Sequence, residues 1–390
     1  MAVLWFTGFE GGHQTKEPFY SVTGSGLTVG TDYARTGDYG CQLEAVVDSV
    51  FAGFLRACSN TNGDISAGFD DDTRIHFYMK IITLPPGSER DMLVYSERTG
   101  SVGLTLVLED DGSLSLSEVN ISTNAVNDLG NTTATYDDGL WHAIQIKDDW
   151  HGGSPSHSYE LIVDDVSKIS GTTDGLAAAS VSTVYFGKLD NAFNSSYEVY
   201  IDDVAITSDD YIAYPFSINM FVPDADGTYT DWARTGFGLT YDWQAVDEIP
   251  PDDNTTYIRS NVADERSSFL CEDSVGTGLG KAIAAVKANY VCLRGAGGDT
   301  THFFIRDSGG TDRDTPTAVA LTAAYKAYAT IWVTNPATSA AWSSVAIDAT
   351  EIGILCAVVE TVTTRCTALQ LHVLYAGLTG RPMIAYNFGG

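Results

Sequence analysis

The chain has 390 residues, of which 44% are hydrophobic and 18% charged, and its 51 acidic against 21 basic side chains give a formal net charge of −30. This composition supports a packed core and excludes a mainly disordered chain. The negative charge argues against nucleic acid and anionic membrane surfaces as partners, because these are bound through Lys and Arg. No apolar run reaches the length of a transmembrane helix, and the opening "MAVLWFTGFEGG" is expected to form a strand rather than a signal peptide.

The first half of the chain predicts a series of short strands. In "RIHFYMKII", alternate residues from Ile75 to Ile81 are apolar and share one face. In "SVGLTLVLEDDGSLSLSEV", two alternating runs flank Asp111–Gly112, which is a strong hairpin signal. Further strands are expected at "LWHAIQIKD", "YELIVDDVSKI", "STVYFGKLD" and "YEVYIDDVAIT". Short alternating strands separated by turn residues are typical of β-sandwiches.

The second half begins after a pause in this pattern. We expect a linker at 213–227, and we interpret "LGKAIAAVKANYVCLRG" as a strand in spite of its alanines. A short helix is predicted after Ser343 or Ser344 as N-cap, with Gly353 as its stop. The predicted fold is therefore all-β, with two tandem jelly-roll-like sandwiches at 1–212 and 228–390, the second of which contains one short helix.

An acidic pair, Asp202 and Asp203, lies inside the apolar strand "YEVYIDDVAIT". Neighbouring strand side chains point to opposite faces, so the two carboxylates cannot act together without a bulge. The favoured interpretation is structural, with a bend at the pair and one carboxylate fixing a nearby turn, and "LIVDDV" repeats the pattern. Calcium binding and catalysis are the alternatives.

A second repeat, "DYARTG" and "DWARTG", predicts a similar turn in both halves.

The order of "DDGLWHAIQIKDDW", "YELIVDDVSK", "FGKLD" and "YEVYIDDVAIT" resembles the laminin-G and concanavalin A-like jelly roll over roughly 1–210. The opening strand is similar to that of such domains in tailed-phage proteins. The resemblance implies a structural role for Trp141 and sugar or calcium sites in rim loops. Glycosidases of this fold carry Glu-x-Asp-x-x-Glu, which is absent, so no catalytic residues are expected. The candidates are Trp150 and His151 for carbohydrate, and Asp70, Asp71 and Asp72 for calcium.

The stretch "YDWQAVDEIPPDDNTTYIRS" resembles a segment of structural proteins of tailed phages, and the likeness extends over about 228–376. In physical terms, Pro250 and Pro251 stiffen the entry to a strand, and the acidic residues beside them supply turn-forming oxygens. A metal site at Asp247, Glu248, Asp252 and Asp253 is the alternative.

These resemblances imply a non-enzymatic structural component of a tailed-phage virion, assembled in the host cytoplasm and displayed on the outer surface. Head decoration is the first expectation, a tail-associated carbohydrate- or receptor-binding adhesin is the alternative, and a glycoside hydrolase comes last. The expected partners are other virion proteins, further copies of the chain and a host surface glycan. No cofactor is expected apart from calcium, and the six cysteines are expected to be reduced core residues.

Overall fold

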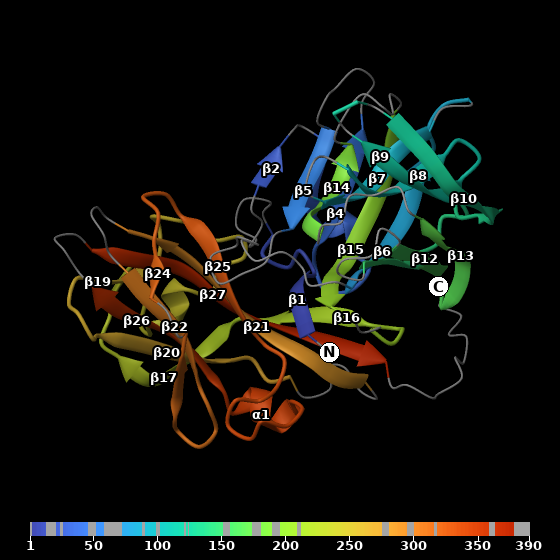
Figure 1. Cartoon of the computed structure of the whole chain (residues 1–390). Coiled ribbons are helices and arrows are strands. Elements are labelled where there is room, and N and C mark those ends of the chain that lie inside the picture. Colours follow the sequence, from blue (N-terminus) through green and yellow to red (C-terminus); the bar gives the residue numbers. More distant parts are fainter. Residues whose placement is uncertain are drawn as a thin grey trace.

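The protein is described by a computed structural model in which antiparallel β-sheets make up almost all of the regular structure (Figure 1). The structure describes residues 2–12, 21–23, 26–45, 52–57, 72–87, 90–98, 102–120, 122–123, 125–150, 157–173, 181–188, 196–208, 212–274, 281–294, 300–315, 318–358 and 363–377. Two sandwiches follow one another along the chain, as the sequence predicts.

The first sandwich packs sheet A against sheet B. The strands of sheet A, in spatial order, are β13 (Val166–Thr173), β12 (His157–Val163), β11 (His142–Trp150), β6 (Asp72–Thr83), β15 (Tyr197–Ser208), β4 (Gly40–Ala45) and β3 (Leu27–Gly30), with β1 (Ala2–Thr7) also beside β15. Sheet B is ordered β10 (Ala125–Thr135), β9 (Ser113–Asn120), β8 (Val102–Glu109), β7 (Arg90–Arg98), β14 (Val181–Lys188), β5 (Ala52–Ala57) and β2 (Ser21–Thr23).

The core of this sandwich is built from the alternation seen in the sequence. Alternate residues of β6 from Ile75 to Ile81 are buried between the sheets, together with the leucines of β8 and β9. The predicted hairpin joins β8 to β9, and Gly112 at its turn has φ +83°, a conformation that favours glycine. The local signals for strands and turn are therefore confirmed.

The second sandwich packs sheet C against sheet D. Sheet C is ordered β18 (Ala233–Thr235), β19 (Tyr257–Ser260), β27 (Thr364–Gly377), β21 (Lys281–Leu293) and β25 (Lys326–Trp332), with β16 (Ser217–Phe221) also beside β27. Sheet D is ordered β17 (Pro223–Thr230), β20 (Arg266–Cys271), β26 (Glu351–Val358), β22 (Thr300–Arg306) and β23 (Asp312–Asp314), and β24 (Val319–Ala320) pairs with β22.

The ambiguous alanine-rich segment forms the strand β21, which confirms its interpretation. The helix α1 (Ser344–Asp348) begins where the sequence predicts: the Ser343 hydroxyl accepts a hydrogen bond from the Ala346 N–H, as an N-cap does. The helix ends before Gly353, since β26 already begins at Glu351. The cysteines that the structure describes are buried and form no disulfide.

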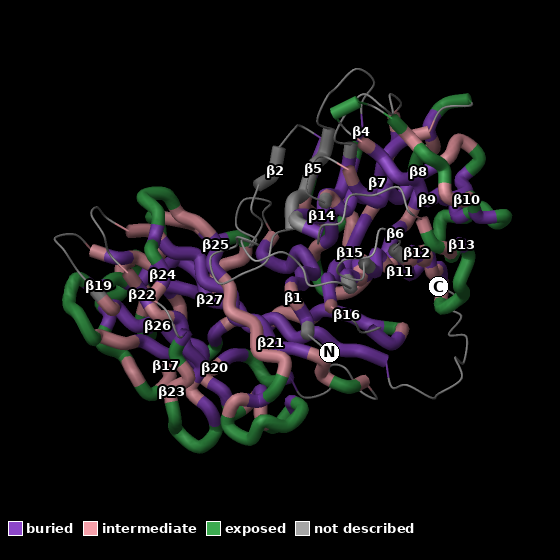
Figure 2. Tube along the Cα trace, in the orientation of Figure 1, coloured by how far each residue is buried: buried purple, intermediate pink, exposed green. Residues whose placement is uncertain are grey.

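The segment 213–227, expected as a linker, contains β16 and the start of β17. Phe216 and Ile218 pack in an apolar cluster with Val3, Phe6 and other residues of both sandwiches. The buried Lys287 of β21 also donates a hydrogen bond to the Phe6 carbonyl, at 2.7 Å. The two sandwiches are thus in direct contact, and Figure 2 shows buried residues running through β1, β16 and β21 at their junction.

Candidate functional site

The acidic pair of β15 lies at this junction and is fully buried, with 0% of Asp202 and of Asp203 exposed. The expected bulge is present, because the register between β15 and β6 shifts between Asp202 and Ala205. Asp203 has φ +49°, a left-handed conformation that Asp tolerates better than most residues. The bulge brings both carboxylates toward the "DYARTG" turn, which lies far away in the sequence.

Hydrogen bonds from protein groups occupy both carboxylates. Asp202 Oδ2 accepts from the backbone N–H groups of Arg35 and Thr36, at 2.7 and 3.1 Å. Asp203 Oδ2 accepts from Arg35 Nη2 at 2.6 Å, and Asp203 Oδ1 accepts from the Ile218 N–H at 2.6 Å. Arg35 Nη2 also donates to the Phe216 carbonyl at 2.7 Å. A buried, fully hydrogen-bonded pair joins the chain segments at the junction and leaves no carboxylate edge for a substrate.

Burial and the neighbouring charge act on the ionisation of this cluster. Burial and the charge of Asp203 raise the pKa of Asp202 well above its ordinary value. Burial alone would lower the pKa of Arg35, but the Asp203 carboxylate raises it overall. The guanidinium lies over the Tyr78 ring, with its central carbon 3.3 Å from the ring centroid. Asp202, Asp203 and Arg35 thus form a buried cluster that holds the junction together, which we call the structural clamp.

Other predicted site residues are placed as follows. The side chains of Trp150 and Asp72 and the whole of His151, Asp70 and Asp71 lie outside the described residues. Trp141 is partly buried and packs against the junction cluster. Pro250 is exposed and Pro251 buried at the turn before β19.

The turn that follows the two prolines is held by carboxylates. The Thr256 hydroxyl contacts both Glu248 and Asp252, and Asp252 Oδ1 accepts from the Thr256 N–H at 3.0 Å. Burial raises the pKa of Glu248 to about 7, so its carboxyl group holds a proton well above the usual pH while it contacts the Thr256 hydroxyl. Among the described residues, no group of three or more His, Cys, Asp or Glu side chains is placed to hold a metal ion.

The repeated Arg-Thr-Gly turn has different partners in the two sandwiches. Arg35 binds the buried Asp203, whereas Arg234 forms an ion pair with Asp242 at 2.8 Å, and the side chain of Arg234 is 44% exposed. The repeat therefore places an arginine that pairs with an aspartate in each half, and the two ion pairs do not belong to one site.

A polar hollow of about 410 Å³ lies on the outer face of sheet B. It spans the start of β7, the end of β8 and the middle of β9 and β10, and such volumes are in the range of small-ligand pockets. Five of its seven lining residues have charged or polar side chains, and the full set is Arg90, Glu109, Ser115, Asp128, Leu129, Gly130 and Asn131.

Arg90 contacts both carboxylates that line this hollow. Its Nη1 donates to Asp128 Oδ1 at 2.9 Å and lies 3.8 Å from Glu109 Oε1. Serine hydroxyls of β9 support both carboxylates: Ser115 donates to Glu109 at 2.5 Å, and Ser117 donates to Asp128 at 2.9 Å. The side chain of Asp128 is nevertheless 58% exposed, so part of it stays available to a ligand.

The chemistry of this arrangement suits hydroxyl groups. Each hydroxyl both donates and accepts a hydrogen bond, and the hollow presents carboxylate acceptors, guanidinium donors and an amide within one lining. Part of this arrangement could be predicted, because the alternating serines of "SLSLSEV" indicate a polar outer face. Nothing in the sequence indicated that Arg90 and Asp128, which lie on strands separated by two others in the sheet, would meet.

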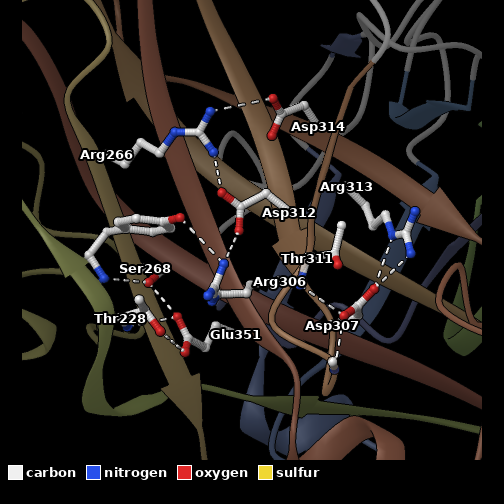
Figure 3. A network of polar contacts seen from close by, with 12 residues as sticks. Thr228, Arg266, Ser268, Arg306, Asp307, Thr311, Asp312, Arg313, Asp314 and Glu351 are labelled. Atoms are coloured by element: carbon white, nitrogen blue, oxygen red, sulfur yellow. Dashed lines mark hydrogen bonds and ion pairs between the residues drawn. The ribbon is translucent and has the colours of Figure 1, made fainter.

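A second polar network covers the outer face of sheet D (Figure 3). Arg266 and Arg306 both bind Asp312, and the Arg313 guanidinium contacts Asp307 at 3.0 Å. Nearby, Glu351 accepts hydrogen bonds from Thr228 and Ser268. These ion pairs and hydrogen bonds join β20, β22, β23 and β26, so we assign the network to stabilisation of the sheet.

Comparison with known proteins gives one family match. Residues 88–204 match the family model described as Laminin G domain. This segment contains every residue that lines the hollow, and the first sandwich accordingly has a Laminin G-like jelly-roll fold. No curated protein sequence matches the chain at a significant level. No helix in the described part of the chain is long and apolar enough to cross a membrane.

Solved structures show only distant likeness. A carbohydrate esterase of the Shiga toxin-encoding bacteriophage phi24B is 14% identical, with 53% of this chain and 100% of that chain covered and a TM-score of 0.36. A botulinum neurotoxin type C structure, described for its interaction with two ganglioside molecules, is 9% identical with a TM-score of 0.35. This chain covers 65% of that one, and 65% of this chain is covered. At these values neither likeness carries an argument about function, and the fold assignment rests on the Laminin G match and the two sandwiches.

Proposed function

We propose that the chain is a non-enzymatic binding protein on the outer surface of a tailed-phage particle, where the hollow of β7, β8, β9 and β10 binds a carbohydrate of the host surface. The observation that carries this proposal is the polar lining around Arg90 and Asp128, which lies wholly within the Laminin G-like segment. The placement on a phage particle rests on the sequence resemblance of the second half.

The charge of the chain supports an outward-facing position. A net charge of −30 would repel packaged DNA, whereas it is compatible with a surface in contact with solvent. An exposed hollow also favours the adhesin alternative over head decoration, since a protein that only covers the head needs no ligand site. Immunogold labelling of particles should therefore mark the tail, and labelling confined to the head would contradict this part of the proposal.

Binding is tested with the full chain on an array of host-surface glycans. We expect binding that weakens by about tenfold or more in Asp128→Asn and in Arg90→Ala, because each loses a charge-assisted hydrogen bond. Arg313→Ala is the matched control for Arg90→Ala, because it removes a partly exposed, ion-paired arginine of the second sandwich. Absence of binding to any glycan, or equal binding by all variants, would overturn the proposal.

Two further measurements address the remaining alternatives. Mass spectrometry of purified particles should detect the chain, and its absence would refute the virion location. Incubation with host polysaccharides should release no sugar. Turnover that disappears in Asp128→Asn would favour the glycoside hydrolase instead.

A further inference from the structure

Sheet C differs in charge from the rest of the molecule. The chain has 51 acidic residues among 390, yet the strands β16, β18, β19, β21, β25 and β27 contain no Asp or Glu. Their charged side chains are all basic: Arg234, Arg259, Lys281, Lys287, Lys326 and Arg365. The strands of sheet C therefore carry no carboxylate side chain, although the protein as a whole is strongly acidic.

Two of these basic residues lie directly opposite each other. Arg259 of β19 and Arg365 of β27 are register partners, so their side chains project from the same face of sheet C. Their neighbours Ile258 and Cys366 point into the core, which places both arginines on the outer face. Arg259 is exposed and Arg365 partly exposed. Like charges at directly opposed positions destabilise a sheet unless another group compensates.

Within the described part of the chain, neither arginine forms an ion pair with a carboxylate. This distinguishes them from Arg35, Arg90 and Arg266, each of which has a carboxylate partner. Acidic residues outnumber basic ones by more than two to one, so arginines without an ion pair are not explained by a lack of carboxylates.

Uncharged polar and aromatic groups hold Arg365 in place. Its Nη1 donates to Asn254 Oδ1 at 2.7 Å, and the guanidinium carbon lies 4.8 Å from the centroid of the Tyr257 ring. The Tyr325 hydroxyl donates to the same Asn254 oxygen, at 3.3 Å. Burial raises the pKa of Tyr325 despite the adjacent Arg365, so this hydroxyl keeps its proton. The Nε atom of Arg365 is buried and has no hydrogen-bond partner. The guanidinium is thus oriented in advance by Asn254 and by the Tyr257 ring.

We propose that Arg259 and Arg365 form a binding site for a single oxyanion, such as the carboxylate or sulfate group of an acidic sugar. Two adjacent guanidinium groups offer the forked donors that bind such groups in a bidentate way. The partly exposed Tyr325 ring beside them provides apolar surface for the rest of a sugar. The net charge of −30 repels long polyanions, so the site suits a small ligand rather than nucleic acid. It lies in the second sandwich and is independent of the hollow in sheet B.

The test uses the full chain, ligand-detected NMR at low salt, and three probes. Galacturonate and galactose 6-sulfate carry the two oxyanions, and methyl galacturonate is the uncharged ester. We expect one or both anions to bind at least about tenfold more tightly than the ester, and Arg259→Gln and Arg365→Gln each to weaken that binding by about tenfold or more. Binding of one anion and not the other identifies the oxyanion.

The control is Arg234→Gln, which removes the same charge from the neighbouring strand β18. Arg234 is already paired with Asp242 at 2.8 Å, so its loss should leave anion binding unchanged. Arg259→Gln should also keep or raise the melting temperature, because it relieves the opposed charges, and this excludes unfolding as the cause of lost binding. The proposal is overturned if neither anion binds, if the ester binds as well as the anions, or if the two arginine variants bind like the control.

Discussion

The strongest prediction of the structure concerns Asp203, whose carboxylate connects the two sandwiches. We expect Asp203→Asn to destabilise the protein, because Asn fits the same space and tolerates φ +49° but carries no charge. The carboxylate accepts hydrogen bonds from Arg35 Nη2, the Thr36 hydroxyl and the Ile218 N–H, at 2.6, 2.8 and 2.6 Å. In either orientation, the amide group of Asn would direct N–H bonds at one of these donors.

The magnitude follows from the burial of the pair. Removing one partner of a buried ion pair costs about 3–5 kcal/mol, because the other charge is left uncompensated. For a domain of this size, this corresponds to a fall of roughly 6–20 °C in melting temperature. Asp202→Asn is the matched comparison: the pKa of Asp202 is already raised, and its acceptors serve only backbone N–H groups. Its cost should be closer to that of one lost hydrogen bond, about 1–3 kcal/mol.

Differential scanning calorimetry of the full chain measures both effects. Because Arg35 and Asp203 also hold Phe216 and Ile218, Asp203→Asn should separate the unfolding of the two sandwiches into distinct transitions. The double variant Arg35→Met, Asp203→Asn should cost less than the sum of the single changes, since no buried charge is left alone. An unchanged transition in Asp203→Asn, or a larger loss in Asp202→Asn, would refute the reasoning.

Three more predictions concern single sites. The pKa of Glu248 is about 7 in the folded protein and 4.5 for the ordinary side chain, so stability should fall as pH rises between these values. Melting curves recorded from pH 4 to 8 should show this fall, and Glu248→Gln should remove it. Burial alone would lower the pKa of His142, but hydrogen bonds to Asp164 and Asp138 raise it overall; the resulting stability should be complete below about pH 6.5 and lost above, and His142→Gln should show no such loss. Gly353→Ala should cost about 1–3 kcal/mol in denaturant unfolding, because its Cβ would lie 2.2 Å from the Phe304 ring, and Phe304→Leu in the same chain should restore part of it.

The sequence alone determined the local features of this protein. Alternation between apolar and polar residues predicted β6, β8 and β9. Asp111–Gly112 predicted the hairpin that joins β8 to β9, and the serine N-cap predicted α1. The Asp-Asp pair also predicted its bulge. These signals depend on residues within a few positions of each other, and the geometry of strands and turns translates them directly into structure.

Only the tertiary structure decided which residues meet. The backbone N–H of Arg35 binds Asp202 across 167 positions, Arg90 reaches Asp128 across 38, and Arg259 faces Arg365 because β19 and β27 pair in one particular register. Strand order and register are set by the burial of whole faces, so no short stretch of sequence contains them. The carboxylates that the sequence singles out became a structural clamp for this reason, while the hollow and the opposed arginines arose from residues that are unremarkable in their own strands.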